Sequence, residues 1–526
     1  MQVTIDGQAL EADGPLTILH AARKLGIDIP TMCYMDNYDP FTSCMICTVE
    51  VVGTGQKLPA CTAQISDGME IATQSEAVRK FRKLTLDLLL SDHVGDCEAP
   101  CRRGCGVSMD IPQMIRHVEA DDLDKAMEVV RADMALPSVL ERFCHAPCET
   151  PCRRGQYDEP IAIKDLTRYA SDRDLQREAP WIPERAVLSG KRIAIVGAGS
   201  SGLSAAYFLA LKGHACTVYE KGTRVLDSLH TRDGELPEWV VEGELKVLRA
   251  LGVEIHLSKE LGDELSPSQL MRDSDALLLA MGQCDPEFLK SLGLKVDDKG
   301  LVTKKGSGLT SVPGVFACGN LLKPDKRVIR SFASGKHSAF VVDQFVNGHS
   351  LIGIPDYYDH TMGKLKEGEI DTFVEHANKV GRQAPAAGKT EVFAIPEAQL
   401  ESTRCLHCDC REKTNCDLRI NSHEYEASQK HFKGPERATY AFVNQDAGAV
   451  YEAGKCIKCG CCVHVTNKEG EEFGFAFVGR GFDLKTTISL GKTLKEGLVD
   501  VAEKVVQSCP TGALSHNEKL GRPKPE

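Results

Sequence analysis

The feature that most constrains this chain is the grouping of its 22 cysteines among 526 residues. They fall in runs toward both ends, and only Cys216, Cys284 and Cys318 stand alone, inside apolar segments. The N-terminal sequence MQVTIDGQAL has no basic segment followed by an apolar one, so we expect a cytoplasmic protein without structural disulfides. The grouped thiols are therefore expected to bind metal or to carry redox chemistry, and the three isolated ones to be buried structural residues.

Charge and hydropathy exclude two other classes of protein. The 63 lysines and arginines against 75 aspartates and glutamates give a net charge of −12, which disfavours a general nucleic-acid binder. No apolar run approaches the ~20 residues of a membrane helix, so no transmembrane segment is expected. The length suggests roughly three or four domains.

Residues 1–78 are expected to form a first domain of short strands around the helical stretch LTILHAARKLGI. Its cysteines follow the pattern C-x10-C-x2-C-x13-C. Four thiolates can hold two irons and two sulfides, whereas zinc sites usually bring their thiolates as two close pairs. The spacing favours a [2Fe–2S] cluster on Cys33, Cys44, Cys47 and Cys61.

The segments PTMCYMDNYDPFTSCMICTVEV and LPACTAQISDGMEI resemble the N-terminal domain of the large iron–sulfur subunit of NADH:quinone oxidoreductase (complex I). They are equally similar to that domain in iron-only hydrogenases and NAD-linked formate dehydrogenases. The resemblance implies a β-grasp ferredoxin domain in which these four cysteines carry the [2Fe–2S] cluster.

Residues 79–190 have helical periodicity and contain two cysteine triplets, each C-x3-C-x3-C. Six thiolates are too few for two all-cysteine [4Fe–4S] clusters, so either one cluster is lost or each takes a non-cysteine ligand. CEAPCRRGC and CHAPCETPCRRGQYDEPIAIKDL resemble the N-terminal domain of the glutamate synthase small subunit and of dihydropyrimidine dehydrogenase, which implies two interleaved clusters. The resemblance places Cys97, Cys101 and Cys152 on one cluster and Cys105, Cys144 and Cys148 on the other.

This segment departs from that family at the fourth ligands. Where the family has a further cysteine, this chain has His93, and the complex I subunit uses the same H-x3-C spacing for a histidine-ligated cluster. His93 is therefore a candidate ligand, the alternative being a surface or capping histidine. Near the position of the family's Glu or Gln ligand stand Asp165 and Thr167, which leaves the second cluster's fourth ligand open; for Asp165 an acidic surface position is favoured.

Residues 191–355 predict a Rossmann-like FAD-binding domain. The segment KRIAIVGAGSSGLSAAYFLALKGHACTVYEK gives a strand, a glycine turn, a helix and a second strand that ends in Glu220. Gly197 permits the tight turn, Gly199 the approach of a pyrophosphate, and Gly202 close packing of helix on strand. The alternative is a purely structural Rossmann unit.

GLTSVPGVFACGN, ending at Asn320, resembles the second flavin contact of glutathione-reductase-like enzymes, although an aspartate normally ends that motif. The double glycine that usually follows the acidic residue is replaced by Asp227 and Ser228, and FAD remains favoured over NAD. The residues expected to bind the cofactor are Gly197, Gly199, Ser201, Gly202, Glu220, Lys221, Gly319 and Asn320.

The glutamate synthase family carries an NADPH-binding domain between its flavin half-sites, and this chain lacks it. The segment from about 258 to 275 crosses directly to the next flavin element, and no second glycine fingerprint occurs. Electrons are therefore expected to arrive from, or leave to, another subunit.

Residues 356–400 are expected to be a linker, and 401–526 a C-terminal, ferredoxin-like iron–sulfur domain. RCLHCDCREKTNCDLR has the pattern C-x2-C-x-C-x5-C, which suits either [4Fe–4S] or zinc on Cys405, Cys408, Cys410 and Cys416. CIKCGCC followed by CP is a bacterial ferredoxin run with an insertion, and it indicates [4Fe–4S] on Cys456, Cys459, Cys462 and Cys509, with Cys461 a bystander. CIKCGCCVHV, GFAFVGRGFD and SCPTGAL again resemble the complex I subunit, but without that family's second cysteine set.

As a composite of these families, the chain is expected to be a multidomain α+β and α/β electron-transfer subunit with about four [4Fe–4S] clusters, one [2Fe–2S] cluster and one FAD. Expected partners are a NADH- and FMN-binding iron–sulfur subunit, or a ferredoxin-linked one, and a terminal reductase, hydrogenase or formate dehydrogenase. Flavin-based bifurcation is compatible with this set but not indicated by the sequence. The alternative function is a self-contained NAD(P)H:acceptor oxidoreductase.

Overall fold

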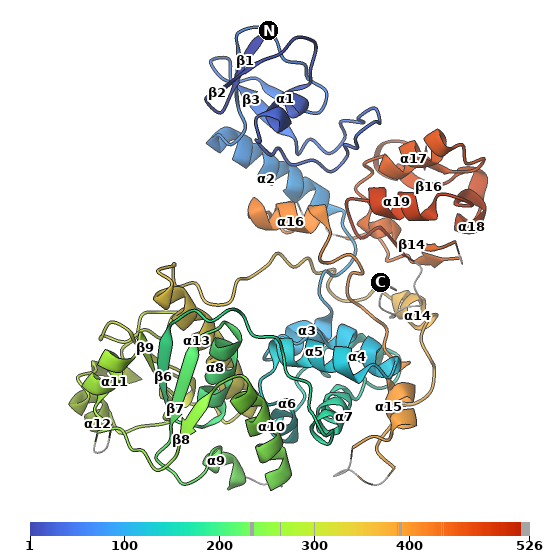
Figure 1. Ribbon diagram of the computed structural model, residues 1–526. Coiled ribbons are helices and arrows are strands. Elements are labelled where there is room, and N and C mark those ends of the chain that lie inside the picture. Colours follow the sequence, from blue (N-terminus) through green and yellow to red (C-terminus); the bar gives the residue numbers. More distant parts are fainter. Residues whose placement is uncertain are drawn as a thin grey trace.

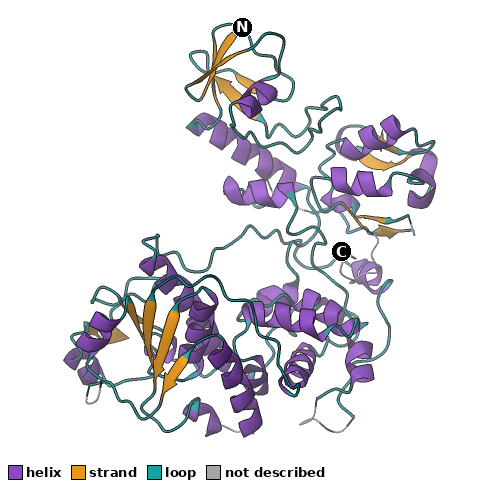
Figure 2. Cartoon of the chain, in the orientation of Figure 1, coloured by secondary structure: helices purple, strands orange, loops and turns teal. Residues whose placement is uncertain are grey.

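The computed structural model describes residues 1–526 except 232–235, 263–264, 299, 387, 389–391, 433, 435, 446 and 517–526. Figure 1 shows the first sheet and the C-terminal elements at one end of the molecule and a parallel sheet at the other, with a group of short helices beside the latter. Figure 2 shows that this group of short helices, which lies between β5 (Met69–Ala72) and β6 (Arg192–Val196) in the sequence, is made of helices and loops. The fold is mixed α and β, as expected.

The N-terminal unit is a mixed five-stranded sheet with one helix. Its strands are ordered β2-β1-β5-β3-β4, with β1 parallel to β5 and the other pairs antiparallel. Thr17 caps the helix by accepting a hydrogen bond from the His20 amide at 3.2 Å. The elements are β1 (Gln2–Ile5), β2 (Gln8–Glu11), α1 (Ile18–Lys24), β3 (Thr48–Val51), β4 (Lys57–Pro59) and β5 (Met69–Ala72).

The helical group that follows carries the two cysteine triplets. Its longest member is joined to a helix from the tail of the chain, because the buried Arg82 guanidinium donates to the Tyr425 hydroxyl at 2.7 Å. Figure 1 shows α16 (Asp417–Glu424) lying along α2. The elements are α2 (Glu76–Ser91), α3 (Pro100–Gly104), α4 (Ile111–Glu119), α5 (Leu123–Asp133), α6 (Pro137–Phe143), η1 (Arg153–Gln156) and α7 (Ile163–Leu175).

The third unit is a parallel sheet of five strands ordered β12-β9-β6-β7-β8. The chain moves from β6 to β7 and β8 on one side and then returns to β9 on the other, so the strand order reverses between β6 and β9. Helix α8 is buried along residues 200–210 because it packs between the sheet and α13. The elements are β6 (Arg192–Val196), α8 (Ser200–Leu211), β7 (Ala215–Tyr219), α9 (Asp227–His230), α10 (Glu238–Ala250), β8 (Glu254–His256), α11 (Pro267–Asp273), β9 (Ala276–Leu279), α12 (Pro286–Ser291), β10 (Val296–Asp297), β11 (Gly300–Leu301), β12 (Val315–Ala317), η2 (Gly319–Leu321) and α13 (Val328–Val346).

The remaining elements include a three-stranded sheet, β13-β14-β17, and a hairpin, β15-β16. A hydrophobic core joins them, with Phe475 and Val505 almost fully buried. The elements are α14 (Glu369–Val374), α15 (Ile395–Ser402), α16, β13 (Val443–Asn444), β14 (Ala449–Tyr451), η3 (Ala453–Lys455), α17 (Cys461–Glu469), β15 (Phe475–Val478), η4 (Gly481–Asp483), β16 (Lys485–Ile488), η5 (Ser489–Gly491), α18 (Leu494–Gly497), α19 (Ala502–Ser508) and β17 (Leu514–His516).

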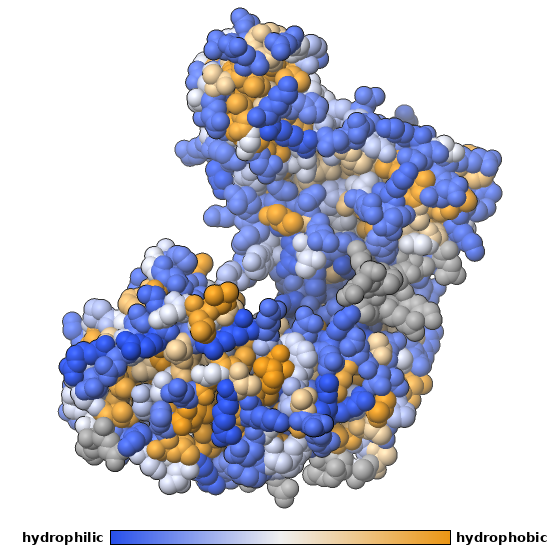
Figure 3. All heavy atoms as spheres, in the orientation of Figure 1, coloured by the Kyte–Doolittle hydropathy of each residue, from blue (hydrophilic) through white to orange (hydrophobic). Residues whose placement is uncertain are grey.

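Hydrophilic side chains cover most of the face in Figure 3, with apolar ones in scattered groups. Among the described helices, none is both long enough and apolar enough to span a membrane.

Candidate functional site: five cysteine cages and a nucleotide pocket

The loops between α1 and β4 bring the first four cysteines together. The Cys44 thiol hydrogen-bonds the Cys33 sulfur, which lowers the pKa of Cys33 to about 5, and the Cys47 thiol likewise lowers the pKa of Cys61. Each of the four side chains is at most 4% exposed. The two pairs also interact with each other through Cys33, so the structure gathers these sulfurs as the spacing predicted.

A second cage lies where α2 ends. His93, Cys97, Cys410 and Cys416 line one small cavity. The Cys410 amide donates to the Cys97 carbonyl at 3.1 Å, which ties the tail of the chain to the helical group. His93 is half-buried, and its Nδ1 is buried without a partner. Desolvation, followed by the nearby His360 and Lys455, holds the pKa of its imidazole well below the usual value. A neutral imidazole is the form that binds iron.

The third cage takes one cysteine from each triplet and the first two cysteines of the 405–416 run. Cys101, Cys152, Cys405 and Cys408 line a separate cavity. The expected grouping of Cys97 with Cys101 and Cys152 is therefore wrong, and the run 405–416 does not form one site.

The physical reason lies in the segment between the two tail pairs. The Arg116 guanidinium on α4 binds the buried Asp409 carboxylate at 2.8 Å. This ion pair holds the chain between Cys408 and Cys410, so the cysteines before Asp409 lie in one cage and those after it in the other.

The fourth cage contains Cys105, Cys144 and Cys148, the set that the second resemblance implied. Cys105 ends α3 and Cys144 ends α6, and all three thiols interact electrostatically. Thr167 faces its own helix, because its hydroxyl donates to the Ile163 carbonyl at 2.9 Å. Asp165, in the first turn of α7, is half-buried.

The fifth cage lies beside α17. Cys456, Cys459, Cys462 and Cys509 line one cavity, as the ferredoxin spacing predicted. The Cys461 sulfur instead faces the Met32 carbonyl at 3.8 Å. Cys461 thus lies outside the cavity lining, although its sulfur hydrogen-bonds the Cys459 thiol, and its role as a bystander stays a prediction.

The donor sets fit iron–sulfur clusters. Burial raises the pKa of Cys97, Cys144, Cys416 and Cys509 to about 12 each, so a bound cation is needed to keep these thiols ionised. Within the described part of the chain, no three His, Cys, Asp or Glu side chains converge on a single metal-ion position.

The nucleotide pocket opens at the carboxyl ends of β6 and β9, where the strand order reverses, and has a volume of about 510 Å³. A Cβ on Gly197, whose φ is +107°, would lie 2.5 Å from the Ala280 carbonyl, and one on Gly202 would lie 1.9 Å from the Gly197 carbonyl. A Cβ on Gly199 would meet nothing within 4 Å. The first and last glycines thus serve close packing, and Gly199 borders open space at the α8 N-terminus, where a pyrophosphate would be favoured.

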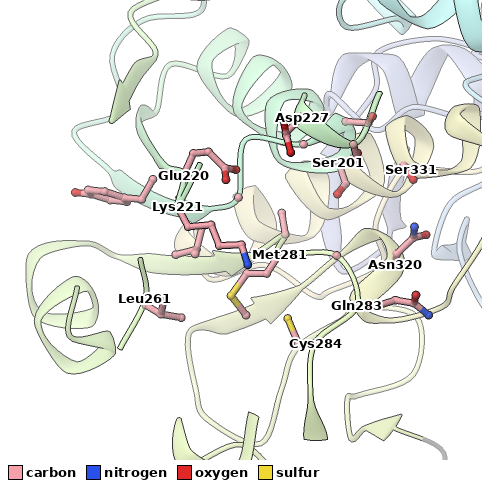
Figure 4. Close-up of a pocket in the computed structure, with 18 of the residues that line it drawn as sticks. Ser201, Glu220, Lys221, Asp227, Leu261, Met281, Gln283, Cys284, Asn320 and Ser331 are labelled. Carbon is pink, nitrogen blue, oxygen red and sulfur yellow. The ribbon is translucent and has the colours of Figure 1, made fainter. Parts of the chain in front are cut away.

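Polar side chains surround this pocket, as Figure 4 shows. The Glu220 carboxylate accepts the Ala198 and Gly222 amides at 2.7 and 2.8 Å, which fixes it at the end of β7. Of the other residues expected to bind the cofactor, Ser201, Lys221 and Asn320 also line the pocket.

The structure also places residues at or beside the pocket whose contribution could not be predicted from the sequence. A Cβ on Gly319 would lie 2.5 Å from the Ser201 hydroxyl, so this glycine allows η2 to approach α8. Asp227 and Ser228, which replace the double glycine, line the pocket. Cys216 and Cys318 are buried as predicted, but Cys284 is half-buried and also lines the pocket, because it lies just beyond the end of β9.

Three known protein families match parts of the chain. Residues 1–76 match the family described as a 2Fe-2S iron-sulfur cluster binding domain, residues 92–179 match dihydropyrimidine dehydrogenase domain II, 4Fe-4S cluster, and residues 155–337 match pyridine nucleotide-disulphide oxidoreductase.

Three curated relatives cover parts of the chain. The beta subunit of the NADP(+)-dependent formate dehydrogenase of Moorella thermoacetica is 36% identical over 35% of this chain and 29% of its own length. An NADH-quinone oxidoreductase subunit of Rhizobium meliloti is 41% identical over 20% of this chain and 12% of its own. The NAD-dependent dihydropyrimidine dehydrogenase subunit PreT of Escherichia coli is 31% identical over 35% and 46%, respectively. The matched part of the chain spans less than half of each relative.

These matches confirm the composite resemblance and the cofactor classes expected from the sequence. The chain is an iron–sulfur flavoprotein of the oxidoreductase class that combines [2Fe–2S], [4Fe–4S] and FAD-binding units.

Proposed function

We propose that this chain is the electron-transfer subunit of a multi-subunit oxidoreductase, linking a NAD(P)H- or ferredoxin-dependent subunit to a terminal reductase, hydrogenase or formate dehydrogenase. The observation that carries this proposal is that the five cages and the nucleotide pocket adjoin one another in an unbroken series. Iron–sulfur clusters exchange single electrons and a flavin exchanges one or two, which is the chemistry these groups supply when bound.

The first two members of the series are the cage of Cys33 and that of Cys459. A hydrogen bond with Cys461 and burial raise the pKa of the Cys459 thiol, and the nearby Cys33 thiol adds to the rise. The Ser43 hydroxyl lies 3.5 Å from the Cys459 carbonyl, and the Phe41 ring packs at a tilt against His464 on α17, with ring centroids 4.0 Å apart. The N-terminal unit therefore packs its cluster loop directly on the C-terminal cage.

The third member is reached through the segment after Cys509. The Thr511 hydroxyl donates to the Lys455 carbonyl at 3.1 Å, and Thr511 lines the Cys459 cage. The next residue, Gly512, lines the His93 cage, and a Cβ there would lie 2.3 Å from the Cys410 sulfur. Two successive residues thus separate these cages.

The next two steps run along single short segments. Cys408 and Cys410 flank Asp409 and lie in neighbouring cages. Cys101 lies in the short helix α3 and Cys105 directly follows it, about one turn further on, and Cys101 also interacts electrostatically with Cys148. In each pair, a few residues of continuous backbone connect one cage to the next.

The last step reaches the nucleotide pocket. Gly106 follows Cys105 directly, and a Cβ on it would lie 2.7 Å from the Ile329 side chain of α13. The preceding residue, Val328, lines the pocket. The Lys336 ammonium on the same helix donates to the Val107 carbonyl at 3.0 Å, which fixes α13 against the cage.

The architecture also supports the subunit function over a self-contained NAD(P)H oxidoreductase. Between β8 and β9 the chain has only residues 257–275, with the short helix α11. The described residues of this unit form one parallel sheet and the two-stranded pair β10-β11, so a nicotinamide domain has no counterpart in them.

Anaerobic purification from the source organism, identification of co-eluting subunits and EPR during a redox titration test the proposal. We expect partner subunits, five titrating clusters and FAD, and little oxidation of NADH or NADPH by the isolated chain with a dye acceptor. Robust NAD(P)H oxidation by the isolated chain would instead establish the self-contained enzyme.

A further inference from the structure

The cage of Cys105, Cys144 and Cys148 has three thiols, and a four-iron cluster needs a fourth donor. We propose that Glu141 supplies it through its carboxylate. This inference rests on the proposed function, because it assumes that the cage holds a cluster.

Glu141 occupies the position that a ligand requires. It lies on the last full turn of α6, three residues before Cys144, so both residues lie on the same side of the helix end. Its carboxylate interacts electrostatically with Cys105, Cys144 and Cys148 alike. One carboxylate close to all three thiols is the arrangement expected of the missing corner of the cage.

Burial without a partner points the same way. Glu141 is 4% exposed, and within the described residues its carboxylate has no hydrogen bond or ion pair, although the Lys164 side chain acts on it electrostatically. Burying a carboxylate away from water costs free energy unless a cation or a hydrogen-bond donor lies beside it. Coordination to iron would remove that cost by giving the carboxylate a cation.

The competing oxygen donors are committed elsewhere. The Thr167 hydroxyl donates to the Ile163 carbonyl at 2.9 Å. Both Glu149 oxygens are occupied, because one accepts the Lys164 amide at 3.1 Å and the other the Arg382 guanidinium at 2.8 Å. Asp165 is only half-buried. Among the described acidic side chains by this cage, Glu141 is thus the one that is both buried and without a hydrogen-bond partner.

The test uses the full chain, purified anaerobically, with iron and labile-sulfide analysis and EPR. Glu141→Ala should lose about one iron atom per chain and gain the oxidised-state EPR signal of a three-iron cluster. Glu141→Cys should restore the full iron content. Glu141→Gln should keep a four-iron cluster with a higher midpoint potential, because a neutral oxygen ligand removes one negative charge.

The matched control is Glu149→Gln, which changes an acid beside the same cage and should leave iron content, EPR and potential unchanged. Full iron and an unaltered EPR signal and potential in Glu141→Ala would overturn the assignment. Loss of the whole cluster in both the Ala and the Cys variants would also overturn it, since it would indicate a packing role. A Cys144→Ala chain with undiminished iron would show instead that the cage holds no cluster, and would contradict the proposed function.

Discussion

The Cys410 amide donates a hydrogen bond to the Cys97 carbonyl at 3.1 Å, although one residue lies in the first fifth of the chain and the other in its last quarter. Both line the cage that also contains His93. The tail run is thereby divided, since Cys408 belongs to the neighbouring cage.

This division predicts that Cys408→Ser and Cys410→Ser perturb different clusters. Each variant should lose or shift one EPR signal, and the two signals should differ in midpoint potential. A single cluster on the whole 405–416 run would make the two spectra change in the same way.

His93→Cys should lower the midpoint potential of its cluster, because a thiolate adds negative charge where a neutral imidazole was bound. An EPR-monitored redox titration measures the shift. The signal of the Cys456 cage in the same sample is the internal control and should not move. An unchanged potential for every cluster would exclude His93 as a ligand.

The CIKCGCC run offers a matched pair of variants. Cys461→Ser should keep the full iron content, because its sulfur faces the Met32 carbonyl. Cys459→Ser should lose or convert one cluster, because its side chain lines the cage. Equal iron loss in the two variants would show that Cys461 is also needed to hold the cluster.

In the nucleotide pocket, Gly199→Val should weaken FAD binding at least tenfold, about 1.4 kcal/mol, with little change in the stability of the flavin-free chain. The reason is that a Cβ there enters open space beside the pocket. Gly202→Val should instead destabilise the protein itself, because its Cβ would lie 1.9 Å from the Gly197 carbonyl. Flavin content by absorbance and thermal unfolding separate the two effects.

The contact between the helical group and the parallel-sheet unit depends on a buried ion pair. The fully buried Arg131 guanidinium on α5 donates to the Glu244 carboxylate on α10 at 2.9 Å. Arg131→Met should lower the free energy of unfolding by about 3–5 kcal/mol, because it leaves Glu244 buried and uncompensated. Adding Glu244→Gln should recover part of that loss in denaturant titrations.

The parts of the site predicted from sequence are those in which local spacing fixes geometry. Cys33 and Cys44 are joined by one loop, and Cys456 and Cys459 by one turn, so a pattern of spacings describes them completely. The same holds for Gly197 and Gly202, whose functions follow from a single strand–turn–helix unit.

What the sequence did not reveal depends on contacts between distant segments. No spacing relates Cys97 to Cys410, because their proximity arises from the packing of α2 on α16 and from the Arg116–Asp409 ion pair. Glu141 carried no signal because a glutamate on a short helix is ordinarily exposed. Cys284 was expected in a core because its neighbours are apolar, whereas the end of β9 places it at the pocket.

The divided tail run has a consequence for the biogenesis of the protein. Because the parallel-sheet unit lies in sequence between the two halves of the ligand sets, the cages of Cys97 and Cys101 cannot close on a nascent chain until the ribosome has passed residue 416. The Cys33 cage needs only the first 61 residues and can be filled long before. The order of synthesis thus allows cofactor loading in two stages, and the two cages that use the tail run can be completed only after the flavin-binding unit has been synthesised.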